Sequence, residues 1–256
     1  MKKLAPVFIF LTMINCNFSN ECRYSLSDNT YYDKNHNLVT ENWTVNDTSK
    51  FGREFRYYKN GLVSTITLYE FDSMQGIEEF YDTLGLLTSM VYWDNLNKSG
   101  PLFEFNKNGS MKIYFTYKDD FPIGNGYVYD FLGGLSRYIY FAEFGRAMFI
   151  VDYGIEKDSL SGSAIIHIKN IQENNTTDSL NFLIQTASPP GFSKYLIFQE
   201  FYNSEFANID TINITGKDEI FVHKKLSKFN EGKNQIILVL ISERTQLRYK
   251  FKQTIP

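Results

Sequence analysis

The sequence predicts an all-β protein, in which a meander of repeated β-hairpins is followed by a β-sandwich. Three observations support this prediction. Aromatic residues make up 17% of the chain, with 18 Tyr and 23 Phe, and such side chains suit a pleated, half-buried surface. The last part of the chain holds seven short runs typical of strands. Glycines recur every 24 residues, as in a structural repeat, in two series: Gly61, Gly85, Gly109, Gly133 and Gly52, Gly76, Gly100, Gly124.

Residues 1–16 are predicted to be an export signal. Lys2 and Lys3 precede an apolar run, residues 4–14, that is shorter than the about 20 residues of a membrane-spanning helix. Cys16 follows, and residues 13–16 resemble a bacterial lipobox, in which the cysteine is lipidated. We therefore expect a lipid anchor at Cys16; ordinary signal cleavage, with Cys16 and Cys22 either free or paired, is the alternative. Residues 17–30 are polar and are expected to form a tether.

Residues 31–153 are predicted to form the hairpin repeats. In the clearest unit an aromatic run ends at Tyr58, Lys59-Asn60-Gly61 follows, and an alternating β-branched run begins at Leu62. Asn-Gly is typical of a two-residue type I′ turn. The turn glycines Gly61, Gly85, Gly109 and Gly133 are therefore each expected to mark a hairpin. One hairpin cannot bury its apolar face alone, so the units are expected to pair into one sheet.

The same period aligns aromatic residues in two columns. One column holds Val45, Tyr69, Trp93, Tyr117 and Phe141, and the other holds Tyr57, Tyr81, Phe105 and Tyr129. Two interpretations stay open for these side chains: a ladder of packed rings, or an exposed platform for a sugar or a peptide. For the second interpretation the candidate ligand platform consists of Trp43, Tyr69, Trp93, Tyr117 and Phe141.

Residues 52–62 and 76–86 carry the repeat motif most fully. Gly-x-Glu-Phe-x-Tyr-Tyr-Lys-Asn-Gly-Leu and Gly-x-x-Glu-Phe-Tyr-Asp-x-x-Gly-Leu resemble the MORN-like repeats of the toxin–antitoxin YwqK-type antitoxin family. The resemblance covers about residues 31–153 and implies a sheet of hairpins. The family name implies an antitoxin that binds a toxin partner. The resemblance supplies no catalytic residues.

Residues 154–162 are expected to form a connector, and residues 163–256 an Ig-like β-sandwich. The seven runs are Ala164–Ile168, Leu180–Thr186, Tyr195–Phe201, Thr211–Thr215, Glu219–His223, Gln235–Ile241 and Leu247–Lys252. Many short strands separated by turn signals favour a sandwich. The run from Glu231 to Leu240 resembles the penultimate strand of Ig-like modules in bacterial surface proteins.

The composition argues against several function classes. A net charge of −3 gives no electrostatic footprint for nucleic acid. The chain has no cysteine after Cys22 and its three histidines lie far apart, so no metal site and no cofactor are expected. The acidic pairs Glu78-Glu79 and Asp119-Asp120 are interpreted as strand neighbours that point to opposite faces, a poor arrangement for acid/base catalysis. We expect a protein that is not an enzyme.

The sequence therefore predicts an exported, non-enzymatic lipoprotein of the cell envelope, acting as a binding or structural spacer module. Its expected location is the outer membrane or the cell surface, with a periplasmic or secreted location as the alternative. A protein or glycan partner and membrane attachment through an N-terminal lipid are expected, and no nucleic acid. The alternative function is an antitoxin-like protein that binds and neutralises a toxin.

Overall fold

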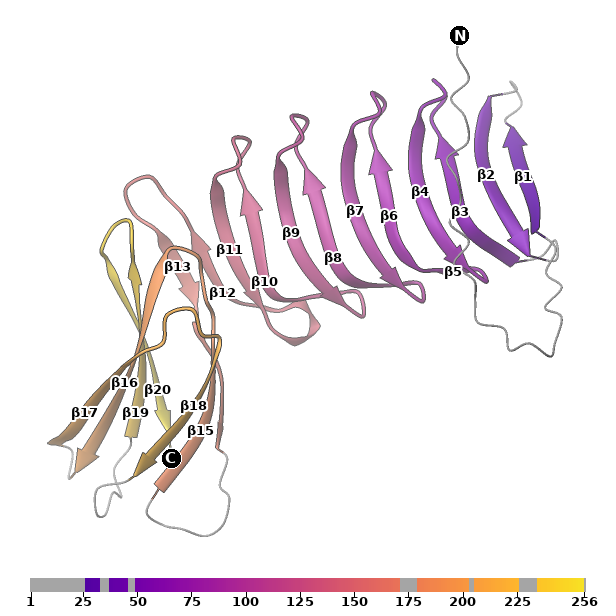
Figure 1. Cartoon of the computed structure of the whole chain (residues 1–256). Coiled ribbons are helices and arrows are strands. Elements are labelled where there is room, and N and C mark those ends of the chain that lie inside the picture. Colours follow the sequence, from indigo (N-terminus) through magenta and orange to yellow (C-terminus); the bar gives the residue numbers. More distant parts are fainter. Residues whose placement is uncertain are drawn as a thin grey trace, which may run out of the picture.

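The computed structural model describes residues 26–32, 37–45, 49–170, 179–202, 205–225 and 234–255. The chain is all-β, and a meander of hairpins precedes a sandwich, which confirms the predicted fold class (Figure 1). The predicted export signal, with Cys16, and residues 17–25 of the predicted tether lie outside the described residues.

The first sheet has 13 strands that follow one another in chain order as a single layer (Figure 1). Each strand pairs antiparallel with the next, except that β4 pairs with both β5 and β6. The strands are β1 (Leu26–Tyr32), β2 (Leu38–Val45), β3 (Ser49–Tyr57), β4 (Val63–Glu70), β5 (Ser73–Met74), β6 (Gly76–Tyr81), β7 (Leu87–Asp94), β8 (Asn97–Phe105), β9 (Met111–Lys118), β10 (Phe121–Tyr129), β11 (Leu135–Phe141), β12 (Ala147–Asp152) and β13 (Ser159–Gly162). Strand β13 lies in the segment expected to be a connector, and β1 begins in the expected tether.

One long edge of this sheet, which we call the upper rim, holds the hairpin tips at residues 58–62, 82–86, 106–110, 130–134 and 153–158 (Figure 1). In the first tip the Gly61 N–H donates to Tyr58 O at 2.9 Å and the Tyr58 N–H donates to Leu62 O at 2.8 Å. Gly61 has φ of 81°, whereas Asn60 has no positive φ. The turn is therefore a three-residue turn closed by a glycine bulge, and the predicted type I′ turn at Asn60-Gly61 is wrong.

The opposite edge, the lower rim, holds the tight turns between hairpins. Phe71-Asp72, Asn95-Leu96 and Asp119-Asp120 are consecutive residues with positive φ, as type I′ turns require. Asp119 and Asp120 thus form a turn, and their assignment to a strand is wrong. The Asp120 carboxylate accepts the Lys98 N–H at 2.8 Å, and Asp72 accepts that of Lys50 in the same way. The two bonds lie 48 residues apart in the sequence, at alternate turns of the lower rim.

The second glycine series lies within strands near the lower rim. Gly100 has φ of 125°, and a Cβ there would lie 2.9 Å from the Tyr92 ring. The pairing of β7 with β8 shifts register between Val91 and Trp93, which is the mark of a bulge. Glycine is required here because the backbone is left-handed and a ring of the neighbouring strand covers it.

The C-terminal part contains seven strands in two sheets, as the sequence predicts. One sheet has the order β14-β15-β18 and the other the order β17-β16-β19-β20. The strands are β14 (Ile165–Asn170), β15 (Ser179–Thr186), β16 (Phe192–Tyr202), β17 (Glu205–Asn213), β18 (Glu219–Lys225), β19 (Asn234–Ser242) and β20 (Arg248–Ile255). Phe182 and Ile184 of one sheet and Leu196 and Leu238 of the other belong to one buried cluster.

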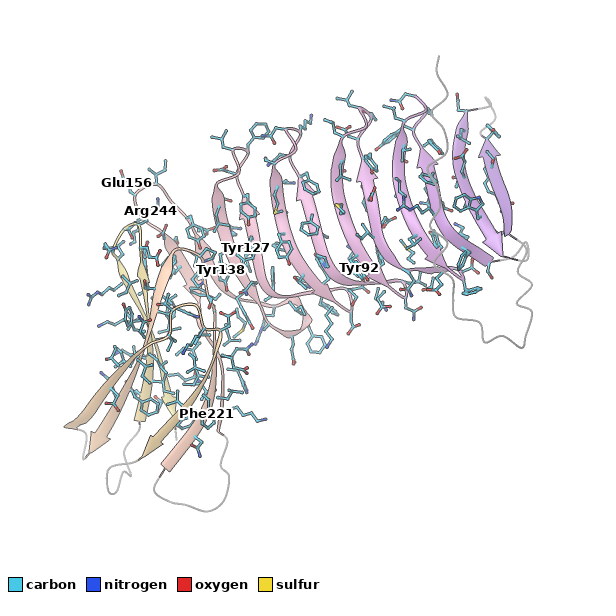
Figure 2. The ribbon with its side chains drawn as sticks, viewed as in Figure 1. Tyr92, Tyr127, Tyr138, Glu156, Phe221 and Arg244 are labelled. Carbon is cyan, nitrogen blue, oxygen red and sulfur yellow. The ribbon has the colours of Figure 1, made fainter. Side chains whose placement is uncertain are left out.

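The same buried cluster extends into the hairpin sheet. Tyr138 of β11 and Phe149 and Val151 of β12 are fully buried within it, together with the sandwich residues. The last hairpins and the sandwich therefore share one hydrophobic core. Side chains of β10–β12 face the sandwich sheets on one side of the meander (Figures 1 and 2).

The buried Gly126 of β10 provides a test of the packing. Its φ is not left-handed, but a Cβ there would lie 2.7 Å from the Phe115 ring and 2.8 Å from the Phe141 ring. Gly126→Ala should therefore lower the free energy of unfolding by about 1–3 kcal/mol, through overpacking. Urea denaturation followed by circular dichroism measures the change. Phe115→Leu in the same chain should recover part of the loss; additive effects of the two substitutions would contradict this explanation.

Candidate functional site

The two faces of the hairpin sheet carry different side chains. Alternate residues of a strand point to opposite faces. Glu54, Glu78, Leu102 and Gly126 occupy equivalent positions, 24 residues apart, on one side, which we call the glutamate face. Phe103, Tyr114, Tyr127 and Tyr138 point to the other side, which we call the tyrosine face.

Four members of the predicted platform lie on the glutamate face. Tyr69, Trp93, Tyr117 and Phe141 each pair with a glycine of the neighbouring strand, at equivalent positions of successive hairpins, and all are half-buried. Lysines bridge them: Lys50 Nζ lies 4.8 Å from the Tyr69 ring centroid, and Lys98 Nζ lies 5.9 and 5.6 Å from those of Trp93 and Tyr117. Phe141 packs on Phe115 at 5.1 Å. The structure thus places aromatic rings and ammonium groups side by side on one face.

Trp43 does not join this column. Asn42, the preceding residue of β2, donates its Nδ2–H to Glu54 at 3.1 Å and so points to the glutamate face. Trp43 therefore points to the tyrosine face, where its ring would lie 3.1 Å from a Cβ at Gly52. The Tyr92 ring likewise lies beside Gly100, 2.9 Å from the position of a Cβ there. The first unit is thus one residue out of step with the 24-residue period.

Two buried carboxylates lie beneath the aromatic column. Glu54 is 1% exposed and accepts hydrogen bonds from Asn42, from Lys50 Nζ at 2.6 Å and from Arg56 Nε at 2.9 Å. Burial alone would raise the pKa of Glu54. The hydrogen bonds from Lys50 and Asn42 and the charges of Lys50 and Arg56 outweigh burial and hold that pKa below its usual value.

Glu78 takes the equivalent place one hairpin later. It accepts the Thr67 Oγ1–H and the Trp93 Nε1–H, each at 2.9 Å. The indole N–H is committed to this bond, so the half-buried ring is held by its edge. The two carboxylates thus position Trp93 and Lys50 by hydrogen bonds.

On the tyrosine face a continuous ladder of rings runs into the sandwich. Successive ring centroids lie between 5.2 and 6.4 Å apart, through Phe103, Tyr114, Tyr127, Tyr138, Phe149 and Phe251. The sequence interpretation missed this ladder because earlier units carry Glu79, Ile66 and Met90 at the matching positions. The signal was available in the spacing of 24 residues between Phe103 and Tyr127 and between Tyr114 and Tyr138. The second predicted column lies nearer the upper rim, where Tyr57 donates to Glu41 at 2.7 Å.

A shallow groove of about 340 Å³ lies on the tyrosine face beside this ladder. Its lining combines two rings, Tyr114 and Tyr127, with the polar side chains of Thr116 and Asn125. A second cavity of about 390 Å³ lies at the start of the sandwich, between Tyr153 and Arg244. In that cavity the buried Asp158 accepts from Arg244 and from Ser242 Oγ, so its charge is paired within the protein.

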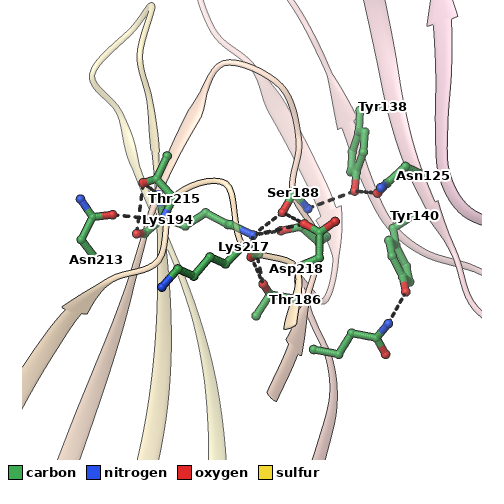
Figure 3. Close-up of polar contacts among 12 residues, drawn as sticks. Asn125, Tyr138, Tyr140, Thr186, Ser188, Lys194, Asn213, Thr215, Lys217 and Asp218 are labelled. Atoms are coloured by element: carbon green, nitrogen blue, oxygen red, sulfur yellow. Dashed lines mark hydrogen bonds and ion pairs between the residues drawn. The ribbon is translucent and has the colours of Figure 1, made fainter. Parts of the chain in front are cut away.

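Polar contacts join β10 and β11 to the sandwich (Figure 3). The buried Tyr138 hydroxyl donates to Asn125 Oδ1 at 2.6 Å and accepts the Ser188 N–H at 3.2 Å. Tyr140 accepts the Gln185 Nε2–H at 3.1 Å. Burial raises the pKa of Tyr138 well above its ordinary value.

Behind Ser188 lies a buried lysine, Lys194, that is 1% exposed (Figure 3). Its Nζ donates to Thr186 Oγ1 at 3.1 Å, to Ala187 O at 3.3 Å, and to Ser188 Oγ and Lys217 O, with the Asp218 carboxylate 3.7 Å away. Burial lowers the pKa of Lys194, whereas the charge of the nearby Asp218 carboxylate acts to raise it. Five oxygens lie within 3.7 Å of the nitrogen, an arrangement that suits an ammonium ion with its three N–H donors. Lys194 therefore holds the two loops that present Ser188 to Tyr138.

Searches among protein-family models, curated proteins and solved structures found no match to this chain. The MORN-like assignment therefore stays a prediction from residues 52–62 and 76–86. The described residues contain no group of three or more His, Cys, Asp or Glu side chains placed to hold a metal ion. They also contain no helix long and apolar enough to cross a membrane.

Glu54 predicts an acid dependence of stability. Its pKa is lower in the folded than in the unfolded chain, so its contribution is present above the unfolded pKa of about 4.3 and is lost as pH falls through the folded pKa. Glu54→Gln should lower the free energy of unfolding by about 1–3 kcal/mol at pH 7. The difference from wild type should shrink in acid, as measured by urea denaturation across pH. A difference that is constant from pH 7 to pH 3 would contradict the assignment.

Tyr138 predicts the opposite dependence at alkaline pH. Its folded pKa is raised, so its contribution is present below the unfolded pKa of about 10 and is lost as pH rises further. Tyr138→Phe should cost about 1 kcal/mol at pH 7, because the bonds to Asn125 and Ser188 are lost. Above about pH 11 the variant should become the more stable protein, since it has no hydroxyl to ionise in the unfolded chain and wild type has by then lost more than the initial difference. The free energy of unfolding of both proteins is measured by urea denaturation across pH. A difference between them that does not change with pH would refute this prediction.

Proposed function

We propose that this chain is a non-enzymatic envelope protein, anchored through a lipid at Cys16, whose hairpin sheet binds a partner on its glutamate face. The observation that carries the proposal is the column of Tyr69, Trp93 and Tyr117, half-buried beside Lys50 and Lys98 on a single layer of strands. Among the described residues no second layer is stacked on β3–β9 (Figure 1). Half-exposed rings with adjacent cations are typical of a recognition surface.

The geometry supports a binding surface that is ordered before the partner arrives. Glu78 holds the Trp93 indole by its N–H, and Glu54 holds Lys50 within reach of Tyr69. Pre-positioned side chains lose little conformational entropy on binding. The ring faces offer stacking surface to a sugar or an apolar side chain, and the lysines offer hydrogen bonds and positive charge. A glycan or a protein partner fits this chemistry.

The junction with the sandwich supports the spacer part of the proposal. The ladder of rings and the Tyr138 hydroxyl join β10–β12 to the sandwich core. The hairpin sheet therefore extends from a sandwich with which its last strands share a core. The proposed binding face on β3–β9 lies away from the sandwich, as a spacer role requires. The antitoxin role that the resemblance implies remains a prediction, since no contact of the described residues favours it.

A pair of neighbouring residues tests the binding face. Trp93 and Tyr92 are adjacent in β7 but point to the glutamate and tyrosine faces respectively. Trp93→Ala should lower the affinity for an envelope glycan or protein at least about tenfold, measured on a glycan array and by pull-down from envelope extracts. Tyr92→Ala, with the same loss of one ring, should leave binding unchanged. Equal effects of the two substitutions, with both proteins folded by circular dichroism, would refute the assignment of the face.

The anchor is tested separately. Radiolabelled palmitate should enter the wild-type chain and not the Cys16→Ala variant, because the thiol is the site of acylation. Cys22→Ala serves as the matched control and should be labelled like wild type. Equal labelling of wild type and Cys16→Ala, or no labelling of wild type, would rule out the lipid at Cys16.

A further inference from the structure

The upper rim of the hairpin sheet exposes large aliphatic side chains at its tips. Leu84 is 77% exposed, Leu132 is 91% exposed and Ile155 is 97% exposed. Leu62, Leu86 and Phe131, at the same tips, are also exposed. The tips follow one another in a row along one edge of the sheet (Figure 1). Single exposed apolar residues are common, but their presence on four of the five tips named, all except that at 106–110, indicates a contact surface.

The backbone N–H groups at the Leu84 and Leu132 tips are bonded within their own turns. The Asp82 carboxylate accepts the N–H groups of Leu84 and Leu86, each at 2.9 Å. Asp130 does the same for Leu132 and Gly134, each at 2.8 Å. An apolar phase offers no hydrogen bonds, so only a tip whose amides are already bonded can enter one at low cost.

Side chains of neighbouring tips join four of the tips in two pairs. Asn60 donates to Thr83 O at 2.8 Å, and Asn108 donates to Phe131 O at 2.9 Å. One carbonyl oxygen of each leucine-bearing tip is thus also bonded. These bonds fix the tip at 82–86 to that at 58–62, and the tip at 130–134 to that at 106–110.

The charges of the two rims differ. On the upper rim Lys59 and Lys107 balance Asp82 and Asp130, and Glu156, labelled in Figure 2, is followed by Lys157. The lower rim has a small acidic excess. It holds six acidic residues, Glu70, Asp72, Asp94, Asp119, Asp120 and Glu143, against four basic ones, Lys50, Lys98, Lys118 and Arg146. Its apolar side chains are partly packed, as in the ring contact of Phe121 with Phe144 at 5.8 Å. An anionic bilayer surface repels the lower rim and accepts the upper one.

We propose that the upper rim docks on a lipid bilayer, with Leu84, Leu132 and Ile155 inserted at the level of the headgroups. The hairpin sheet then stands edge-on to the membrane, and its two faces stay in water. Lys59 and Lys107 meet anionic headgroups beside the inserted side chains. This contact is additional to a lipid at Cys16 and does not depend on it.

Site-specific fluorescence tests the proposal in the full-length chain. Cys16 and Cys22 are replaced by serine, and one cysteine, Leu132→Cys or Phe144→Cys, carries a polarity-sensitive dye. Phe144, 78% exposed on the lower rim, is the matched control. With vesicles of phosphatidylethanolamine and phosphatidylglycerol, emission at position 132 should rise several-fold and shift to the blue, while position 144 should not respond. Both proteins share the same N-terminal segment, so its own membrane affinity affects both equally.

A second measurement uses unlabelled protein with the same two serines. Leu84→Ser, Leu132→Ser and Ile155→Ser together should lower vesicle partitioning at least about tenfold, because three aliphatic side chains lose their apolar contact. Leu96→Ser with Phe144→Ser on the lower rim should leave it unchanged. Equal dye responses at positions 132 and 144, no response at 132, or equal partitioning of the two variants would overturn the proposal. Loss of glycan or protein binding by Trp93→Ala is independent of these outcomes.

Discussion

A single layer of strands has no second sheet to pack against, and the rest of the structure depends on this constraint. Over β3–β9 the described side chains on each face find partners along the layer itself, whereas those of β10–β12 also contact the sandwich. On the glutamate face hydrogen-bonded carboxylates, Glu54 and Glu78, support the first hairpins. Towards the sandwich the equivalent positions hold Leu102 and Gly126, and rings pack over them. The support of the meander thus changes from hydrogen-bonded carboxylates to apolar packing as the meander approaches the sandwich.

The aromatic ladder completes this change. Rings on the tyrosine face continue from Phe103 to Tyr138 and on into the sandwich core at Phe251. Cross-strand aromatic pairs each contribute modestly, but the ladder joins the hairpins to a well-packed core. The first hairpins, which lie farthest from that core, rely on turn bonds such as Lys50 to Asp72. Their uncovered faces and rims are therefore the parts free to meet a partner or a membrane surface.

Much of the fold was predictable because its signals are local. The 24-residue glycine period, the alternation within runs and the turn residues all act over one hairpin, and they placed the meander and the seven sandwich strands correctly. Apart from the turn type at Asn60-Gly61, the errors arose where neighbouring hairpins meet. Trp43 is displaced by one residue, so its ring faces away from Trp93. Asp119 and Asp120 both have positive φ and form a turn whose twist matches that of the adjoining strands. The identity of the two residues did not by itself distinguish this turn from a strand.

The sequence alone determined the class of fold and the tips that carry Gly61, Gly85, Gly109 and Gly133, since these follow from periodicity and from residues that tolerate positive φ. The hairpin of β12 and β13 lies beyond the glycine period and was not predicted. Tertiary structure decided which aromatic residues share a face, because a bulge or a shift of one residue reverses the direction of every later side chain in a strand. It also decided that Tyr138 and Phe149 belong to the core of the sandwich rather than to a separate sheet. That contact joins segments far apart in the chain, and its energy comes from burial that exists only after both have folded.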